Sequence, residues 1–334
     1  MTEDPTTALS SMLERGLHLR MDGVVERSIE VVAIDQQSLS DSDIPQRSTH
    51  PISRLRLTLT SGRQLNVILK RLRPQPGKDV CREVLTYRRL LADGRLGAPQ
   101  LYASVYDDAR ERYWLLLEDV GKCALGRCGV DERVAAVRWA ARMHATHHGR
   151  PTELRDLGCL GEHGPQFYDT LTSAAWLRLT SWAEPAASAR FNRLMARFHQ
   201  TVEFLDTQPR TLVHGDLSDT NLFVQRNGRW RIRPIDWEWA AIGVGAWDLD
   251  KLLAGDGSAK PQLQAAYLDE FARQTGTPLD TRTLETVLTH CAIVRMLWNL
   301  GCPSPPPQGV RWDGVGINRL LDQIAVLQER AADG

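Results

Sequence analysis

The sequence lacks the features that mark several classes of protein. No stretch approaches the roughly 20 apolar residues that a membrane helix needs, so we expect no membrane partner. Its 41 basic and 41 acidic residues balance and no basic-aromatic motif occurs, which argues against a nucleic-acid partner. Residues 1–5 are acidic and lead into no apolar run, so we expect no signal peptide and a cytoplasmic location.

Cysteine is scarce and irregularly spaced. The 334 residues include six cysteines, and without a secretory signal we expect no disulfide framework. Cys123 and Cys128 lack the paired C-x-x-C spacing typical of zinc sites. The histidines at 144, 147 and 148 could form a metal site with Cys159 or His163, but zinc sites normally show tighter paired spacing. Buried or inert thiols are therefore the expectation.

One run of polar residues stands out from this background. Residues 214–221 read His-Gly-Asp-Leu-Ser-Asp-Thr-Asn, and a strand-like run ends at Ile235-Asp236-Trp237-Glu238. The spacing matches the H-x-D-L-x-x-x-N loop and later metal-binding aspartate of phosphoryl-transfer sites. His-Gly-Asp alone also occurs in ordinary turns. Five matched positions followed by such a strand favour a catalytic loop.

Each residue of this run suits a step of phosphoryl transfer. Magnesium takes hard oxygen ligands, which makes Asp236 and Asn221 candidate metal ligands. Asp216 is the candidate catalytic residue that accepts or orients the proton of an attacking hydroxyl, with Asn221 as its catalytic neighbour. His214 is expected to brace the loop rather than react. The sequence thus predicts a site for Mg²⁺ and a nucleoside triphosphate.

A lysine and a glutamate upstream complete the pattern. Residues 64–72 form an apolar, partly β-branched run that predicts a strand carrying Lys70, with Arg71 as the rival cation. Apolar residues at 80, 84, 87 and 91 recur at helical spacing, so Glu83 lies beside an apolar stripe. Lys70 is the candidate contact to the nucleotide phosphates, and Glu83 is expected to hold it. A solvated helix charge is the alternative for Glu83.

With these motifs in place, the chain resembles the aminoglycoside phosphotransferase and choline kinase-like superfamily of small-molecule kinases. His-Gly-Asp replaces the His-Arg-Asp of protein kinases, and Ile-Asp-Trp-Glu replaces Asp-Phe-Gly. Softer matches lie at residues 115–120, 141–145 and 243–249. The resemblance implies an α+β, two-lobed protein kinase-like fold. Its small lobe is an antiparallel sheet with one main helix, and its larger lobe is mainly helical.

The resemblance also implies a nucleotide site, with one departure. Glu118 and Val120, in the segment that would link the lobes, are candidate nucleotide contacts. The phosphate-covering loop of protein kinases is glycine-rich, whereas residues 35–54 contain no glycine. Ser38 and Ser40 are the candidate phosphate contacts there. The choice between ATP and GTP stays open.

Three segments are expected along the chain. Residues 1–28 form an N-terminal extension with a short helix near 9–19, residues 29–120 form the N-lobe, and residues 121–334 form the C-lobe. Helical patterns in the C-lobe cover 130–148, 165–182, 186–207, 261–275, 279–300 and 313–331.

Evidence on the acceptor is thinner. Glu238, Trp237, Trp298 and Trp312 are candidate residues of the acceptor pocket, the last two flanking a proline-rich segment at 301–309. A rigid connector between core helices is the alternative for that segment. The chain from residue 240 onward contains 11 acidic and 8 basic residues, and this small excess of negative charge favours a cationic acceptor. Tryptophan rings also attract amines by cation–π contact. An amine-bearing acceptor such as an aminoglycoside is favoured, while a sugar, nucleoside or other hydroxylated compound stays open.

The sequence therefore predicts a Mg²⁺-dependent kinase that phosphorylates a hydroxyl of a small molecule, either a metabolic or an antibiotic-resistance enzyme. The alternative is a kinase-like protein that binds nucleotide or a partner without turnover. The complete set of Lys70, Glu83, Asp216, Asn221 and Asp236 speaks against that alternative. A protein kinase fits less well, because no A-P-E motif follows Asp236.

Overall fold

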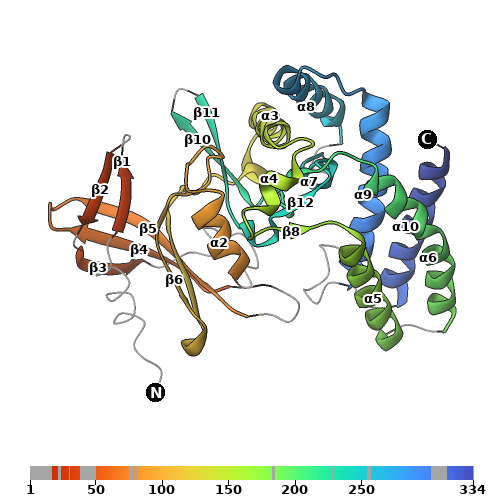
Figure 1. Ribbon diagram of the computed structural model, residues 1–334, viewed down its shortest axis with the longest axis horizontal. Helices are drawn as coiled ribbons and strands as arrows, with labels where there is room; N and C mark the ends of the chain where they lie inside the picture. Colours follow the sequence, from red (N-terminus) through yellow and green to blue (C-terminus); the bar gives the residue numbers. More distant parts are fainter. Residues whose placement is uncertain are drawn as a thin grey trace. The chain divides into compact units, whose positions relative to one another are not determined.

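The computed structural model describes ten ranges of the chain (Figure 1): residues 17–21, 24–29, 31–37, 50–74, 79, 81–182, 185–227, 229–253, 257–301 and 314–333. Two compact units emerge. The first comprises Met1–Ala136, Leu157–Leu160 and His214–Ala240, and the second Val137–Asp156, Gly161–Val213 and Ala241–Gly334. The catalytic-loop candidate, which is the segment of residues 214–221, therefore belongs to the same unit as the N-terminal strands. The lobes expected at 29–120 and 121–334 divide the chain differently and stay a prediction.

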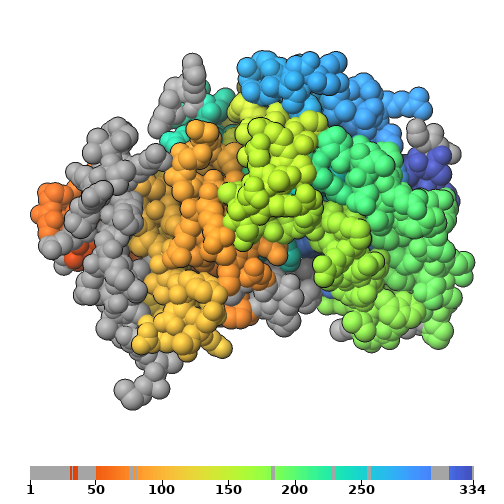
Figure 2. Space-filling view, viewed as in Figure 1, coloured from red at the N-terminus to blue at the C-terminus, as the bar shows by residue number. Residues whose placement is uncertain are grey.

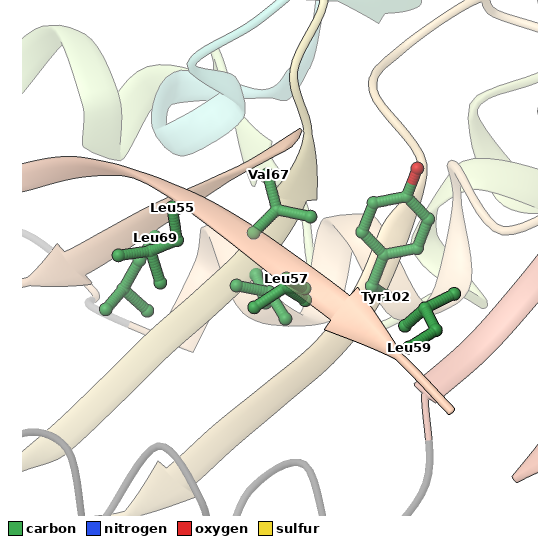
Figure 3. Packing of buried hydrophobic residues seen from close by; sticks show 7 residues of the cluster. Leu55, Leu57, Leu59, Val67, Leu69 and Tyr102 are labelled. Carbon is green, nitrogen blue, oxygen red and sulfur yellow. The ribbon is translucent and has the colours of Figure 1, made fainter. Parts of the chain in front are cut away.

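A five-stranded antiparallel sheet with the order β3-β4-β5-β7-β6 builds the first unit. Its strands are β3 (Val31–Gln37), β4 (Ile52–Leu59), β5 (Gln64–Leu72), β6 (Leu101–Asp107) and β7 (Arg112–Glu118). Alternate residues of a strand point to the same face, so Leu55, Leu57 and Leu59 of β4 are buried together. They pack with Val67 and Leu69 of β5, Tyr102 of β6 and Leu116 of β7 in one apolar cluster (Figure 3).

The segment expected to carry a short helix is a hairpin where the structure describes it. β1 (Leu17–Met21) pairs antiparallel with β2 (Val24–Ile29). The helix near 9–19 is therefore wrong for its last three residues, and residues 9–16 lie outside the described part. The reason is visible in the sequence, where Leu17, Leu19 and Met21 alternate with polar residues at the period of a strand.

One helix, α2 (Cys81–Arg89), accompanies the sheet. Asp79 accepts a hydrogen bond from the Cys81 backbone N–H (2.9 Å) and so caps the first turn. The helix buries Glu83, Val84, Thr86 and Tyr87, which fall on one face at helical spacing. Glu83 thus faces inward in the first turn, where the helix dipole also favours a negative charge.

The end of the first unit is a hairpin of β10 (Leu222–Asn227) and β11 (Arg229–Pro234). The loop of residues 214–221 precedes β10, and the short helix η3 (Trp237–Trp239) follows β11. η3 packs on α2. Both ends of the hairpin therefore carry the residues that the motif analysis selects.

The second unit is mainly helical. It contains the later part of α3 (Val130–Thr146), together with α4 (Pro151–Arg155), α5 (Pro165–Trp182), α6 (Pro185–Asp206), α7 (Ala246–Leu253), α8 (Lys260–Thr275), α9 (Thr281–Gly301) and α10 (Gly314–Asp333). The six helices expected from periodicity are confirmed within about two residues at each end. A small sheet of β8 (Gly161–Glu162), β12 (Ala241–Gly243) and β9 (Thr211–Val213) completes the unit.

Helix α9 is the centre of this unit. It packs against α5, α6, α7, α8 and α10, and ten of its side chains are buried on several faces, as expected of a helix surrounded by others. On the face drawn in Figure 2, α8 in light blue lies beside α3 in yellow-green. Arg142 of α3 donates to Glu270 of α8 (3.3 Å), which joins the two helices. Among the described residues, no helix has the length and apolarity to cross a bilayer.

Candidate active site

Lys70 is the hub of the candidate site. On β5, Val67 and Leu69 face the apolar cluster, so alternation turns Lys70 to the opposite side of the sheet. Its ammonium lies 2.9 and 2.7 Å from the two carboxylate oxygens of Glu83 and 2.5 Å from Oδ1 of Asp236. Three residues that are far apart in sequence thus meet at one cation. Lys70, rather than its rival Arg71, holds this position.

The cluster carries more negative than positive charge. Burial alone would lower the pKa of Lys70, but the carboxylates of Asp236 and Glu83 outweigh it and raise that pKa above its ordinary value. Burial raises the pKa of Glu83, and the nearby Asp236 and Glu238 add to the shift against the opposing effect of Lys70. Two carboxylates therefore contact the Lys70 ammonium and a third, Glu238, lies near it, and this surplus of negative charge suits a divalent cation.

The backbone holds Asp236 in an uncommon conformation. Its φ of 65° and ψ of 63° place it in the left-handed region, where among described residues other than glycine Glu111 is its one companion. Aspartate tolerates this region better than most residues, and such strain clusters at functional sites. The turn lets the chain leave β11 and enter η3 at once. The Asp236 side chain remains about a third exposed (34%) and so is accessible to a ligand.

Asp216 and Asn221 are brought together within the catalytic-loop candidate. The Asn221 amide group donates to the Asp216 backbone oxygen (2.9 Å) and to its carboxylate Oδ2 (3.2 Å). The Ile235 N–H donates to the Asn221 carbonyl (2.9 Å), which ties the loop to the residue before Asp236. The loop and the end of β11 are therefore one connected structure.

Gly215 explains why this loop differs from the protein-kinase sequence. Its φ is +87°, and a Cβ atom there would lie 2.1 Å from the Trp239 backbone oxygen. No side chain fits such a gap. His214 is fully buried beside Trp237, with ring centroids 4.5 Å apart, and its Nε2 donates to the Ile235 carbonyl (2.9 Å). His214 thus braces the loop.

The residues of this site fit a magnesium ion. Asp236 offers a partly exposed carboxylate and Asn221 an amide oxygen, which are hard ligands of the type magnesium prefers. In the part of the chain that the structure describes, no three His, Cys, Asp or Glu side chains form a ready-made metal cage. Magnesium commonly binds through one or two protein oxygens plus phosphates and water, so a sparse ligand set is the expected one.

Arg233 is a residue that the motif analysis does not select. It is 1% exposed, and its guanidinium donates to Glu118 (2.9 Å from Nη1, with a second contact from Nη2), to Gln225 (3.0 Å), and to the carbonyls of Gly97 (2.7 Å) and Ala98 (3.3 Å). Burial alone would raise the pKa of Glu118, but the contacts from Arg233 hold it below its ordinary value. An arginine in an otherwise alternating strand gives no sequence signal of this role.

The two candidate nucleotide contacts at the end of β7 lie in this network. The Glu118 carboxylate is engaged by Arg233 and by the Gln100 N–H (3.0 Å). The Val120 carbonyl accepts from the Gln225 side chain (3.1 Å). Their contact with nucleotide stays a prediction. Ser38 and Ser40 lie outside the described residues.

The four acceptor-pocket candidates fall in different surroundings. Trp237 is fully buried beside the ring of His214, and its contact with an acceptor stays a prediction. Glu238 is partly exposed and lies 3.2 Å from His50 Nε2. Since His50 Nδ1 accepts from the Arg73 N–H (3.1 Å), Nε2 carries the proton and donates to Glu238. Trp312 lies outside the described residues.

Trp298 belongs to an aromatic group in the second unit. Its ring lies 5.9 Å from Phe167 and 5.8 Å from Trp247, and both Phe167 and Trp298 are partly exposed. The buried guanidinium of Arg295 stacks 3.7 Å from the centre of the Trp247 ring. One face of Trp247 is therefore already covered by a cation, whereas Trp298 keeps exposed surface.

Comparison with known proteins identifies the family. Residues 52–284, well over half of the chain, match the model of the phosphotransferase enzyme family. The chain belongs to this family. No curated protein sequence gives a significant match.

Solved structures share the fold at low identity. A candidate aminoglycoside phosphotransferase from Ralstonia eutropha JMP134 is 16% identical over 97% of this chain and 98% of its own, with a TM-score of 0.60. The microcompartment-associated aminopropanol kinase is 15% identical over 98% and 96%, with a TM-score of 0.59. A spectinomycin phosphotransferase solved with ADP and spectinomycin is 14% identical over 98% and 97%, with a TM-score of 0.50. The chain therefore has the α+β, protein kinase-like fold, and it is a small-molecule phosphotransferase by family.

Proposed function

We propose that the protein transfers the γ-phosphoryl group of ATP or GTP to a hydroxyl of a small molecule in a Mg²⁺-dependent reaction. The observation that carries the proposal is the junction at Lys70, whose ammonium contacts Glu83 and Asp236. The loop of Asp216 and Asn221 is tied to the same strand end. Phosphoryl transfer depends mainly on positioning and charge neutralisation, and this junction supplies groups for both.

Each residue then has a distinct task. Lys70, held by Glu83, binds the phosphates of the nucleotide. Asp236 and Asn221 would hold magnesium, which when bound neutralises charge on the phosphate oxygens. Asp216 orients the acceptor hydroxyl and takes its proton as the oxygen bonds to the γ-phosphorus and the bond to the β-phosphate oxygen breaks. The nucleoside diphosphate leaves with the electrons of that bond.

The test is turnover with Mg·ATP and Mg·GTP on aminoglycosides, amino alcohols, sugars and nucleosides, with Asp216→Asn as the blank. An orienting or proton-accepting carboxylate contributes about 10²–10⁴ in rate, so the variant should lose kcat by that factor. Its affinity for Mg·nucleotide, measured by calorimetry, should change little, because Lys70 and Asp236 remain. Full activity of Asp216→Asn would overturn the assignment. Nucleotide binding without turnover on any acceptor would favour the non-catalytic alternative.

For the acceptor, we propose an amine-bearing compound. Two structural relatives are named for amine compounds, an aminoglycoside and aminopropanol. In the turnover panel, the aminoglycosides and amino alcohols should therefore react in preference to sugars and nucleosides that lack an aliphatic amine. Preferred turnover of the sugars or nucleosides would remove the amine from the proposal.

A further inference from the structure

Two cysteines beside the catalytic-loop candidate form a close pair. Cys123 and Cys128 flank the short helix η2 (Leu125–Arg127), and their sulfur atoms lie 3.4 Å apart. Cys123 is exposed and Cys128 is partly buried. A disulfide has a sulfur–sulfur distance of about 2.05 Å, so the two atoms need to approach by only about 1.4 Å. The spacing in sequence gives no hint of this pair, because an i, i+5 separation matches no redox or metal motif.

The turn that carries the pair is attached to the catalytic-loop candidate. The Gly126 N–H donates to the Asp219 carbonyl (3.1 Å), and Asp219 lies between Asp216 and Asn221. The Val224 N–H donates to the Cys123 carbonyl (2.8 Å), and Ala124 forms a β-bridge with Phe223. The six residues 123–128 thus contact both the loop and the strand that follows it. A disulfide between Cys123 and Cys128 would join the two ends of the turn that makes these contacts.

We propose that Cys123 and Cys128 are a reversible disulfide site, and that its oxidation stiffens the attachment of the 123–128 turn to the loop of residues 214–221. The oxidant is hydrogen peroxide. A thiol attacks the peroxide, whose O–O bond breaks to give a sulfenic acid and one water. The second sulfur then attacks the first, the S–O bond breaks, and a second water leaves with the proton of the second thiol. A dithiol reverses the bond by exchange.

The surroundings assign the order of the two thiols. Burial, together with the hydrogen bond to Cys123, raises the pKa of Cys128 to about 12. Cys128 therefore stays protonated, and the exposed Cys123 is the thiol that meets the peroxide. Cys128, held 3.4 Å away, is the resolving thiol. The proposal needs no turnover, so it stands or fails independently of the proposed reaction.

The chain offers a direct chemical test, because Arg127 lies between the two cysteines and Lys122 and Arg133 bound them. Trypsin releases residues 123–127 and 128–133 as separate peptides from the reduced protein. After treatment of the full chain with hydrogen peroxide, mass spectrometry should find the two peptides joined, and dithiothreitol should separate them. Cys128→Ser should abolish the joined species, while the control Cys81→Ser should leave it unchanged. Oxidation of other thiols without the joined peptides would overturn the site.

Amide hydrogen exchange tests the mechanical part. In the oxidised protein, exchange in peptides covering residues 123–128 and 214–224 should slow by about threefold or more, because the bond suppresses local opening of the turn. Cys123→Ser treated with peroxide should exchange like the reduced protein. Unchanged exchange in a protein that carries the disulfide would overturn the coupling to the loop. Slowing in Cys123→Ser as well would assign the effect to other oxidation.

Discussion

At the scale of single residues, two candidate-site positions of the first unit have left-handed backbone conformations. Asp236 adopts left-handed backbone angles at the point where its carboxylate meets Lys70. Gly215 also has a positive φ, on the loop that carries Asp216. The conformation of Asp236 costs stability, whereas glycine adopts a positive φ at little cost, which suits it to position 215. Substitutions here should therefore damage geometry as well as stability.

Gly215→Ala should disable the loop. A methyl group would be 2.1 Å from the Trp239 backbone oxygen, and neither backbone segment can yield without moving the loop or η3. The left-handed conformation alone costs an alanine about 1–2 kcal/mol, and the clash adds to this, so we expect a loss of more than about 3 kcal/mol in the free energy of unfolding. Urea unfolding measures the loss, and turnover should fall with it.

Gly62→Ala provides the matched control for this prediction. Gly62 also has a positive φ (+78°), but a Cβ there meets nothing within 4 Å. The free energy of unfolding of Gly62→Ala should fall only by the conformational cost of about 1–2 kcal/mol, and the variant should keep its activity. Equal losses in the two variants would show that the contact with Trp239 does not constrain Gly215.

At the scale of elements, periodic patterns predicted most of the structure, and tertiary context decided the remainder. The strand of residues 64–72 and the helices of the second unit follow their apolar periods closely. The hairpin of β1 and β2 has the alternation of strands but is too short for that pattern to outweigh a helical alternative. The spacing of the motif residues likewise selected Lys70, Glu83 and Asp236 as site candidates. No pattern revealed Arg233, because two of its partner segments, at Gly97 and Glu118, are more than a hundred residues away in the sequence.

Arg233→Leu should weaken the junction of β7, β11 and the loop at residues 97–98. The change removes the guanidinium that donates to the Gly97 and Ala98 carbonyls, and it leaves the Glu118 carboxylate without its cation, although the Gln100 N–H still donates to it. Breaking a buried pair costs about 3–5 kcal/mol, and because Glu118 is 29% exposed we expect about 2–4 kcal/mol in unfolding free energy. Denaturant unfolding of Arg233→Leu measures this loss of unfolding free energy.

A second substitution separates charge from packing at this junction. Adding Glu118→Gln to Arg233→Leu removes the unpaired charge and should recover part of the loss, so the two changes should be non-additive. Strict additivity would show that the ion pair is energetically unimportant. Nucleotide affinity of the same variants would report whether the network positions the segment of Glu118 and Val120.

At the scale of the whole molecule, the balanced charge hides different local environments. The sequence has 41 residues of each sign, yet the Lys70 cluster concentrates carboxylates in the first unit. The second unit instead buries a neutral polar group, His290 of α9, with Nδ1 3.2 Å from the Thr201 hydroxyl and its ring stacked on Phe204 at 4.0 Å. Composition cannot distinguish these environments, because each depends on which side chains the fold brings together.

His290 should make the stability of the second unit depend on pH. Burial lowers its pKa from 6.5 to about 4, so the folded state binds fewer protons than the unfolded state between these values. The stability that the neutral His290 contributes is therefore fully present above pH 6.5 and is lost as the pH falls toward 4. Between pH 7 and pH 5 the linkage amounts to about 2 kcal/mol, since each pKa unit corresponds to about 1.4 kcal/mol.

His290→Gln removes the titrating group and should show a shallower decline in unfolding free energy over that range. The exposed His199, changed to Gln in the same way, is the control and should retain the wild-type slope. Equal slopes for wild type and His290→Gln would show that another group governs the acid sensitivity.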